Sequence, residues 1–143
     1  MSDNLTLPYK EQITSRLQQD NTWWSTGTVE EEFSFYPKRQ YFDLVFPLIK
    51  DIINRRAAVI IGQKGVGKTV LAQQSIDALI KKGISPHRIA YINFNNQIFR
   101  ALSLKSLFDI CREISNNFDK EGWYLIFDNL EYLQNWQKQI ENL

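Results

Sequence analysis

Residues 57–69 read Ala-Ala-Val-Ile-Ile-Gly-Gln-Lys-Gly-Val-Gly-Lys-Thr, and this stretch decides the fold. Its last eight residues fit Gly-x-x-x-x-Gly-Lys-[Ser/Thr], the phosphate-binding P-loop motif. The apolar run at 57–61 is typical of a buried parallel strand. After the loop, apolar residues recur with helical spacing from Val70 to Ile80, and Gly83 ends the pattern, which predicts a helix beginning at Lys68. Strand, glycine loop and helix follow one another as the motif requires.

The chemistry of this loop predicts a phosphate site. Glycines let the backbone turn tightly and aim its N–H groups at phosphate oxygens, and the start of a helix adds a partial positive charge. The Lys68 ammonium can reach the β- and γ-phosphates, and the Thr69 hydroxyl can bind Mg²⁺. The predicted nucleotide-binding residues are Gly62, Gln63, Lys64, Gly65, Val66, Gly67, Lys68 and Thr69.

Composition limits the remaining possibilities. The chain has 143 residues, 43% of them hydrophobic and 13% aromatic, which predicts a folded protein with a real core. A formal net charge of +1 gives no broad field to recruit nucleic acid or an anionic membrane. The single cysteine, Cys111, lies in an apolar helical pattern and is expected to be a buried thiol. The first residues carry no signal segment, so we expect a cytoplasmic protein without a membrane span.

The pattern outside the P-loop alternates between helices and strands. We predict α-helices at 5–20, 41–56, 104–116 and 136–143, and further strands at 88–94 and 122–127, with loop at 21–32. Ser103 is the expected N-cap of the third of these helices. Apolar strands alternating with helices indicate an α/β fold with a parallel sheet of about three strands. We divide the chain into an N-terminal helical and loop arm at 1–40 and a core at 41–143.

Two sequence details predict local structure. Trp23 and Trp24 are adjacent, and neighbours in an extended chain point to opposite faces. We therefore expect one tryptophan to anchor the arm while the other meets a partner or another part of the chain. His87 follows Pro86 in a predicted turn, so we interpret it as a surface residue.

A carboxylate follows the last predicted strand. Asp128 comes directly after Leu125-Ile126-Phe127, and the carboxyl ends of parallel strands meet at one edge of the sheet. P-loop enzymes place an aspartate there to hold Mg²⁺ against the phosphates. Thr69 and Asp128 are therefore the predicted metal-binding residues.

With these motifs in place, the chain resembles the AAA-type ATPase domain of a group of uncharacterised bacterial and archaeal ATP-binding proteins. The resemblance covers roughly residues 20–143 and includes the P-loop, the strand Tyr91-Ile92-Asn93-Phe94 and Trp136. It implies a three-layer α/β/α P-loop NTPase fold, ATP and Mg²⁺ as ligands, and a site for ATP hydrolysis. The P-loop contacts only phosphates, so ATP itself is implied by the resemblance alone.

The chain departs from that group at the water-activating residue. The group's Asp-Glu is here Asp128-Asn129, and an asparagine can position water but cannot accept a proton as a carboxylate does. Glu131 lies three residues after Asp128 and is the alternative base. We therefore assign Asn129 and Glu131 as the candidate catalytic residues and expect an ATPase weakened by Asn129. Lys64 stands where many relatives have arginine, which keeps the charge but loses the planar fork.

The second departure is length, because AAA-type sheets contain two further strands and a helical lid. Three explanations stay open at this point. The chain is a fragment, a partner supplies the missing strand, or the P-loop strand and the Asp128 strand pair directly, as in P-loop kinases and GTPases. If the chain is a fragment, a C-terminal domain is missing from it, and if a partner supplies the strand, that partner is an unknown protein. An oligomer is compatible with all three explanations.

Three functions fit these observations. The first is a Mg²⁺-dependent ATPase module coupled to an unknown partner. The second is a nucleotide-dependent binding or switch module with little hydrolysis, which Asn129 favours. The third is a small P-loop kinase, ranked last because only Arg100 and Arg112 lie between the second and third strands.

Overall fold

The computed structural model describes residues 7–31, 47, 58–60, 67–117 and 122–143. Within these residues the chain combines helices with a parallel sheet, as predicted. The helices are α1 (Leu7–Asp20), α2 (Trp23–Thr26), α5 (Lys68–Lys81), α6 (Leu104–Ser115) and α7 (Trp136–Glu141). The strands are β1 (Ala58–Ile60), β2 (Ile89–Asn93) and β3 (Tyr124–Asp128). Short 3₁₀ turns lie at Pro86–Arg88, Gln97–Phe99 and Leu130–Tyr132.

The strand order is β1-β3-β2, with every pair parallel. Ile60 of β1 and Asn93 of β2 are both register partners of Asp128, the last residue of β3. All three strands therefore end at the same edge. Of the three arrangements that the sequence left open, the structure has β1 paired directly with the Asp128 strand.

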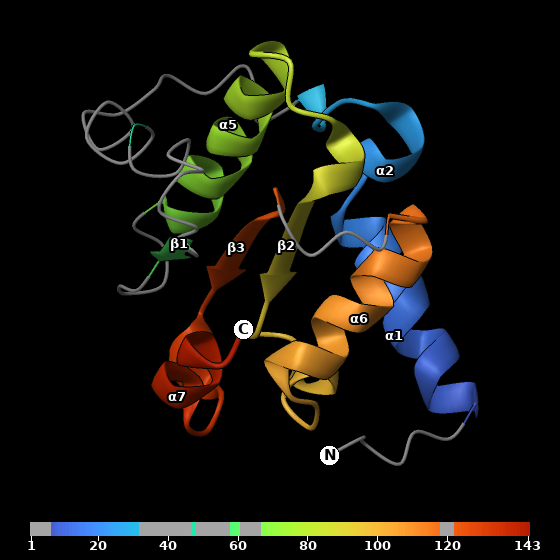
Figure 1. The fold of residues 1–143 in the computed structure, drawn as a ribbon, viewed down its shortest axis with the longest axis vertical. Coiled ribbons are helices and arrows are strands. Elements are labelled where there is room, and N and C mark those ends of the chain that lie inside the picture. The colour runs from blue at the N-terminus through green and yellow to red at the C-terminus, as the bar shows by residue number, and fades with distance from the viewer. Residues whose placement is uncertain (1–6, 32–46, 48–57, 61–66, 118–121) are drawn as a thin grey trace.

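Helices cover both faces of the sheet (Figure 1). On one face Ile89, Tyr91 and Ile126 pack against α5 in a cluster with Ala72, Ile76 and Leu79. On the other face the alternate residues of β2 and β3, together with Phe94 just after β2, pack against α1 and α6 in a second cluster: Ala90, Ile92, Phe94 and Phe127 with Ile13, Leu17, Leu104, Leu107 and Cys111. Both strands are buried on two sides, which explains why they read as nearly continuous apolar runs.

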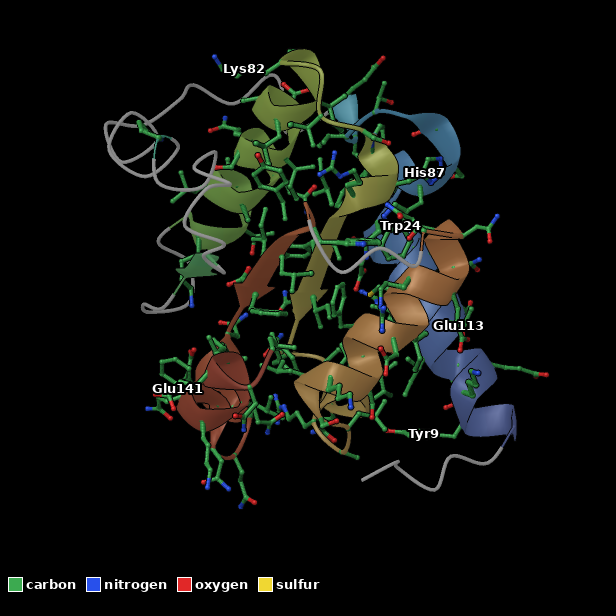
Figure 2. The ribbon with its side chains drawn as sticks, viewed as in Figure 1. Tyr9, Trp24, Lys82, His87, Glu113 and Glu141 are labelled. Carbon is green, nitrogen blue, oxygen red and sulfur yellow. The ribbon has the colours of Figure 1, made fainter. Side chains whose placement is uncertain are left out.

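The open edge of β2 is covered by side chains of the first two helices. The Asn21 amide, at the end of α1, donates to the Tyr91 carbonyl at 3.0 Å and accepts from the Tyr91 N–H at 2.7 Å. The indoles of Trp23 and Trp24 both donate to the Ile89 carbonyl, at 3.0 and 2.8 Å. Figure 2 labels Trp24 beside the start of β2. Side chains thus satisfy backbone groups that an edge strand would otherwise expose.

This region corrects two predictions. The segment expected to be loop at 21–32 contains the helical turn α2, which ends at Gly27 with a positive φ of 78°. The tryptophans do not diverge, because in a helical turn adjacent side chains are about 100° apart and two long indoles can converge on one carbonyl. No signal in the sequence pairs Trp23 or Trp24 with a strand 65 residues away.

The other elements lie close to their predicted positions. Helix α5 begins at Lys68 and is followed by Gly83 at a φ of 99°. Ser103 caps α6 by accepting from the Ser106 N–H at 3.1 Å, and Asn116 ends it in the left-handed region. Cys111 is buried and His87 is exposed, both as expected.

Some predictions fall outside the part of the chain that the structure describes. They include most of the predicted helix at 41–56 and the boundary between arm and core at residue 40. That boundary stays a prediction, although α1 contributes Ile13 and Leu17 to the same apolar cluster as the sheet. No helix among the described residues is long and apolar enough to cross a membrane.

Candidate functional site

The candidate site lies where the three strands end. Helix α5 begins at Lys68 within the P-loop motif, residues 93–96 lie at and after the end of β2, and Asp128 ends β3 and is followed by Asn129. The parallel register brings these segments together, because Asp128 pairs with Ile60 on one side and Asn93 on the other. Of the predicted phosphate-binding residues, Gly62, Gln63, Lys64, Gly65 and Val66 lie outside the described residues.

The start of α5 carries the rest of the motif. Gly67 is the N-cap with φ 84° and ψ 17°, a left-handed conformation that a residue with a Cβ adopts at a cost. The turn lets the helix begin at once, so Lys68 and Thr69 occupy its first two positions. Gly67 has no side chain that could cap the N-terminus, and the N–H groups of a first turn lack partners within their own helix. An anion placed there would be stabilised by these donors and by the helix dipole.

Asp128 connects α5 to the sheet. Its side chain is 0% exposed, and its Oδ2 accepts from the Thr69 hydroxyl at 2.9 Å and from the Tyr91 hydroxyl at 2.8 Å. Its Oδ1 is buried and has no hydrogen-bond partner among the residues that the structure describes. A buried carboxylate oxygen is costly to leave unpaired, so it marks a position where a further donor would be stabilising.

Tyr91 was not among the residues that the sequence singled out for the site. It is 3% exposed and points from β2 toward β3, with its hydroxyl on Asp128. Burial, and next the Asp128 carboxylate, raise the pKa of Tyr91 above its usual value of 10.0. The phenol therefore stays protonated and acts as a donor. Because Tyr91 is the third residue of an apolar strand, its sequence context predicts a core residue. Its hydrogen bond to Asp128 becomes evident only when the strands are placed side by side.

Asn129 bridges Lys68 and β2. Its Oδ1 accepts from the Lys68 ammonium at 2.8 Å, and its Nδ2 donates to Asn93 Oδ1 at 2.7 Å. The same Asn93 oxygen accepts from the Asn95 N–H at 2.9 Å. The backbone of Asn129 lies in the left-handed region, with φ 56° and ψ 37°, which asparagine tolerates better than most residues. Both ends of the amide are thus occupied.

Glu131, the other candidate catalytic residue, lies in the 3₁₀ turn Leu130–Tyr132 and is exposed. Hydrogen bonds join Lys68 to Asn129 and Thr69 to Asp128, whereas none joins Glu131 to these residues in the described part of the chain. Its catalytic role stays a prediction.

A polar cavity of about 410 Å³ opens beside Thr69 and Tyr91. It lies between the end of α1, the first turns of α5 and the loop after β2. Burial raises the pKa of Asp20 in its wall, and Arg16, at 3.2 Å from that carboxylate, acts in the opposite direction. The remaining lining residues are hydrogen-bonding side chains: Gln19, Thr22, Glu30, Gln73, Asn93, Asn95 and Asn96.

Both arginines between β2 and β3 have packing roles. Arg100 donates to the Phe94 carbonyl at 2.7 Å and lies over the Tyr132 ring, 4.4 Å from its centroid. Arg112 pairs with Asp109 and lies over Phe108. Arg100 thereby holds the loop that follows β2.

A family described as "AAA domain" matches residues 54–143. A protein of Haemophilus influenzae (strain ATCC 51907 / DSM 11121 / KW20 / Rd), described as "Uncharacterized protein", is 31% identical over 87 residues. That match covers 59% of this chain and 21% of the Haemophilus protein, so the chain spans about a fifth of that relative's length. No solved structure matches.

Proposed function

Because the chain belongs to the AAA domain family, we propose that it is an ATP-binding P-loop module that binds ATP together with Mg²⁺ and hydrolyses it slowly. One observation carries this proposal. The start of α5 and the end of β3 are joined by two hydrogen bonds, Lys68 to Asn129 at 2.8 Å and Thr69 to Asp128 at 2.9 Å. These pairs connect the phosphate-binding half of such a site to its metal-binding half.

The proposed fold follows from the same arrangement. Helices lie on both faces of a parallel sheet whose carboxyl edge holds the site, which supports a three-layer α/β/α P-loop NTPase fold. Coupling of ATP turnover to a protein partner, and assembly into an oligomer, stay proposals.

The residues present suit a magnesium ion. Mg²⁺ prefers oxygen ligands and is commonly held by one or two protein side chains together with substrate phosphates. The Thr69 hydroxyl donates its hydrogen bond to Asp128, so the lone pairs of its oxygen stay available to a metal. Asp128 Oδ1 is buried and has no hydrogen-bond partner within the described residues, so it can bind the metal directly or through a metal-bound water. When bound, Mg²⁺ would neutralise charge on the β- and γ-phosphates.

In this proposal Lys68 binds the terminal phosphate, and Asn129 limits the rate of its hydrolysis. The Lys68 ammonium offers a charge-assisted hydrogen bond to phosphate oxygens, and in this structure Asn129 holds it at the site. Asn129 can orient a water through its amide, but it has no carboxylate to remove a proton. Hydrolysis at this site would therefore rest on positioning and electrostatic stabilisation alone, which supports slow turnover.

The same residue favours a second candidate, a nucleotide-dependent switch with little hydrolysis. Both ends of the Asn129 amide are already bonded, to Lys68 and to Asn93. A phosphate that takes over Lys68 would release Asn129 and alter its link to the β2 loop. In this second candidate function, nucleotide binding changes the state of the protein and hydrolysis is not required.

One pair of measurements separates the two candidates. Equilibrium binding of ATP is measured with excess Mg²⁺ and with EDTA, and phosphate release is measured under the first condition. Mg²⁺-dependent binding with release on the minute timescale or faster supports the ATPase. Mg²⁺-dependent binding without release supports the switch, and absence of ATP binding contradicts both.

A further inference from the structure

We propose that Tyr91 is a positioning residue for the metal-binding carboxylate, and that Asn21 at the end of α1 fixes Tyr91 in place. This inference rests on the proposed Mg²⁺–nucleotide site. It extends that site to two residues outside the P-loop and outside the end of β3, one of them in the N-terminal segment.

The first step is the contact between Tyr91 and Asp128. Two donors converge on Oδ2 of Asp128, the Thr69 hydroxyl at 2.9 Å and the Tyr91 hydroxyl at 2.8 Å. The Thr69 hydroxyl comes from α5, and the Tyr91 hydroxyl comes from β2 on the face of the sheet that packs against α5. A carboxylate held by two donors on one oxygen has a fixed rotation about its own axis, and its Oδ1 stays available.

The contact is also shielded from water. Tyr91 and Asp128 are both nearly inaccessible to solvent, so water does not replace the hydroxyl easily if it is removed. Partners of this kind, which orient a metal ligand without touching the metal, commonly change metal affinity by about 10- to 100-fold when they are mutated.

The second step is the placement of Tyr91 itself. At the β2 edge both backbone polar groups of Tyr91 are bound by the Asn21 amide, which is 1% exposed. Asn21 thus acts as a neighbouring strand would, but at one residue only. Its own amide is held to α1 by a bond to the Leu17 carbonyl at 2.8 Å. The position of the Tyr91 hydroxyl is therefore tied to α1.

The test uses a coupling ratio, defined as the ATP dissociation constant in EDTA divided by that in excess Mg²⁺. Tyr91→Phe keeps the buried ring and removes only the hydroxyl. We expect its ratio to fall by about tenfold or more, toward one, while ATP binding in EDTA stays within about twofold of the parent. A folded Tyr91→Phe protein with the parent's ratio overturns the inference and leaves the proposed function intact.

Tyr9→Phe is the matched control. It also removes one tyrosine hydroxyl that donates to the protein, in this case to the Ile98 carbonyl, and its position in α1 is far along the helix from Asn21. We expect Tyr9→Phe to have the same coupling ratio as the parent protein. An equal fall in Tyr9→Phe means that the effect is a general loss of structure, and this result also overturns the inference.

Asn21→Ala tests separately whether Asn21 holds Tyr91 in place. It also replaces Tyr91→Phe as the test if that variant does not fold. It leaves the hydroxyl in place but removes the clamp, so its ratio should fall between those of the parent and Tyr91→Phe. Trp24→Phe is its control, because it removes another bond to β2 without touching Tyr91, and Trp23 still bonds to Ile89. An unchanged ratio in folded Asn21→Ala contradicts the role of α1. A parent ratio of one contradicts the proposed metal site and this inference together.

Discussion

Replacing Asn129 by glutamate introduces a carboxylate where the resemblance to AAA-type ATPases implies a water-activating glutamate, and the structure predicts both a benefit and a cost. The benefit is catalytic. General-base action contributes about 10²- to 10⁴-fold to a rate. The Lys68 ammonium lies at hydrogen-bond distance from the present side chain and would hold the pKa of the introduced carboxylate low. A carboxylate with a low pKa is a weak base, and the gain should therefore lie at the lower end of this range. We expect Asn129→Glu to accelerate hydrolysis by about 10²-fold.

The cost is in stability. The backbone of Asn129 is left-handed, at φ 56° and ψ 37°, and most side chains other than asparagine and glycine cost about 1 kcal/mol more there. The amide's bond to Asn93 is lost, which is worth about 0.5–1.5 kcal/mol. A stronger, charge-assisted bond to Lys68 offsets part of this. The free energy of unfolding should fall by about 1–2 kcal/mol.

The assay is single-turnover hydrolysis of Mg²⁺–ATP, with urea unfolding of the same samples. Asn129→Gln is the matched control, because it has the length and backbone cost of glutamate without the charge. If Asn129→Glu is no faster than Asn129→Gln, and both fold and bind ATP, the water-activating role of this position is wrong. Glu131→Gln tests the rival base: complete loss of turnover in that variant would assign catalysis to Glu131.

Three further predictions concern the metal, a helix cap and the thiol. Asp128→Asn should weaken ATP binding in excess Mg²⁺ much more than in EDTA, as calorimetry would show; equal effects would make Asp128 a structural residue only. Ser103→Ala removes the side-chain cap of α6 and should lower the free energy of unfolding by about 1 kcal/mol in urea titrations, while an unchanged value would contradict the cap. Burial raises the pKa of Cys111, so the unfolded thiol ionises first as pH rises through its usual value of 9.0. Stability should therefore fall by about 1.4 kcal/mol from pH 8 to pH 10 through this group, and Cys111→Ala should remove that part of the slope.

Local signals in the sequence predicted much of the fold. The start of α5 follows from the glycines before Lys68 and the spacing of apolar residues after it. The cap at Ser103 and the buried strands β2 and β3 follow from equally local patterns. In each case the residues that specify the element lie within it or next to it, so no knowledge of the tertiary structure is needed.

The site was predicted only in part, for a physical reason. Motif spacing and strand ends singled out Lys68, Thr69, Asp128 and Asn129, which the structure joins in pairs by hydrogen bonds. Their roles in binding and catalysis stay predictions. Tyr91 was missed, since an aromatic residue within an apolar strand gives no sign that its hydroxyl meets a carboxylate 37 positions later.

The N-terminal contacts were missed for the same reason. The bonds from Asn21 to Tyr91 and from the two tryptophans to Ile89 join residues 65 to 70 positions apart. Neither periodicity nor composition encodes such pairings. Direct pairing of β1 with β3 was one of three open arrangements, and the strand register was needed to choose among them.

The central claim, that α5 and the end of β3 form a Mg²⁺–nucleotide site, is tested most directly by ATP affinity in Lys68→Ala. A charge-assisted hydrogen bond is worth about 1.5–3 kcal/mol, which corresponds to about 10- to 150-fold in affinity. Lys105→Ala, at an exposed lysine on α6, is the control for loss of a positive charge elsewhere. Calorimetric titration in excess Mg²⁺ should show ATP binding weakened by that factor in Lys68→Ala and unchanged in Lys105→Ala. A folded Lys68→Ala protein that binds ATP as tightly as the parent would contradict the account.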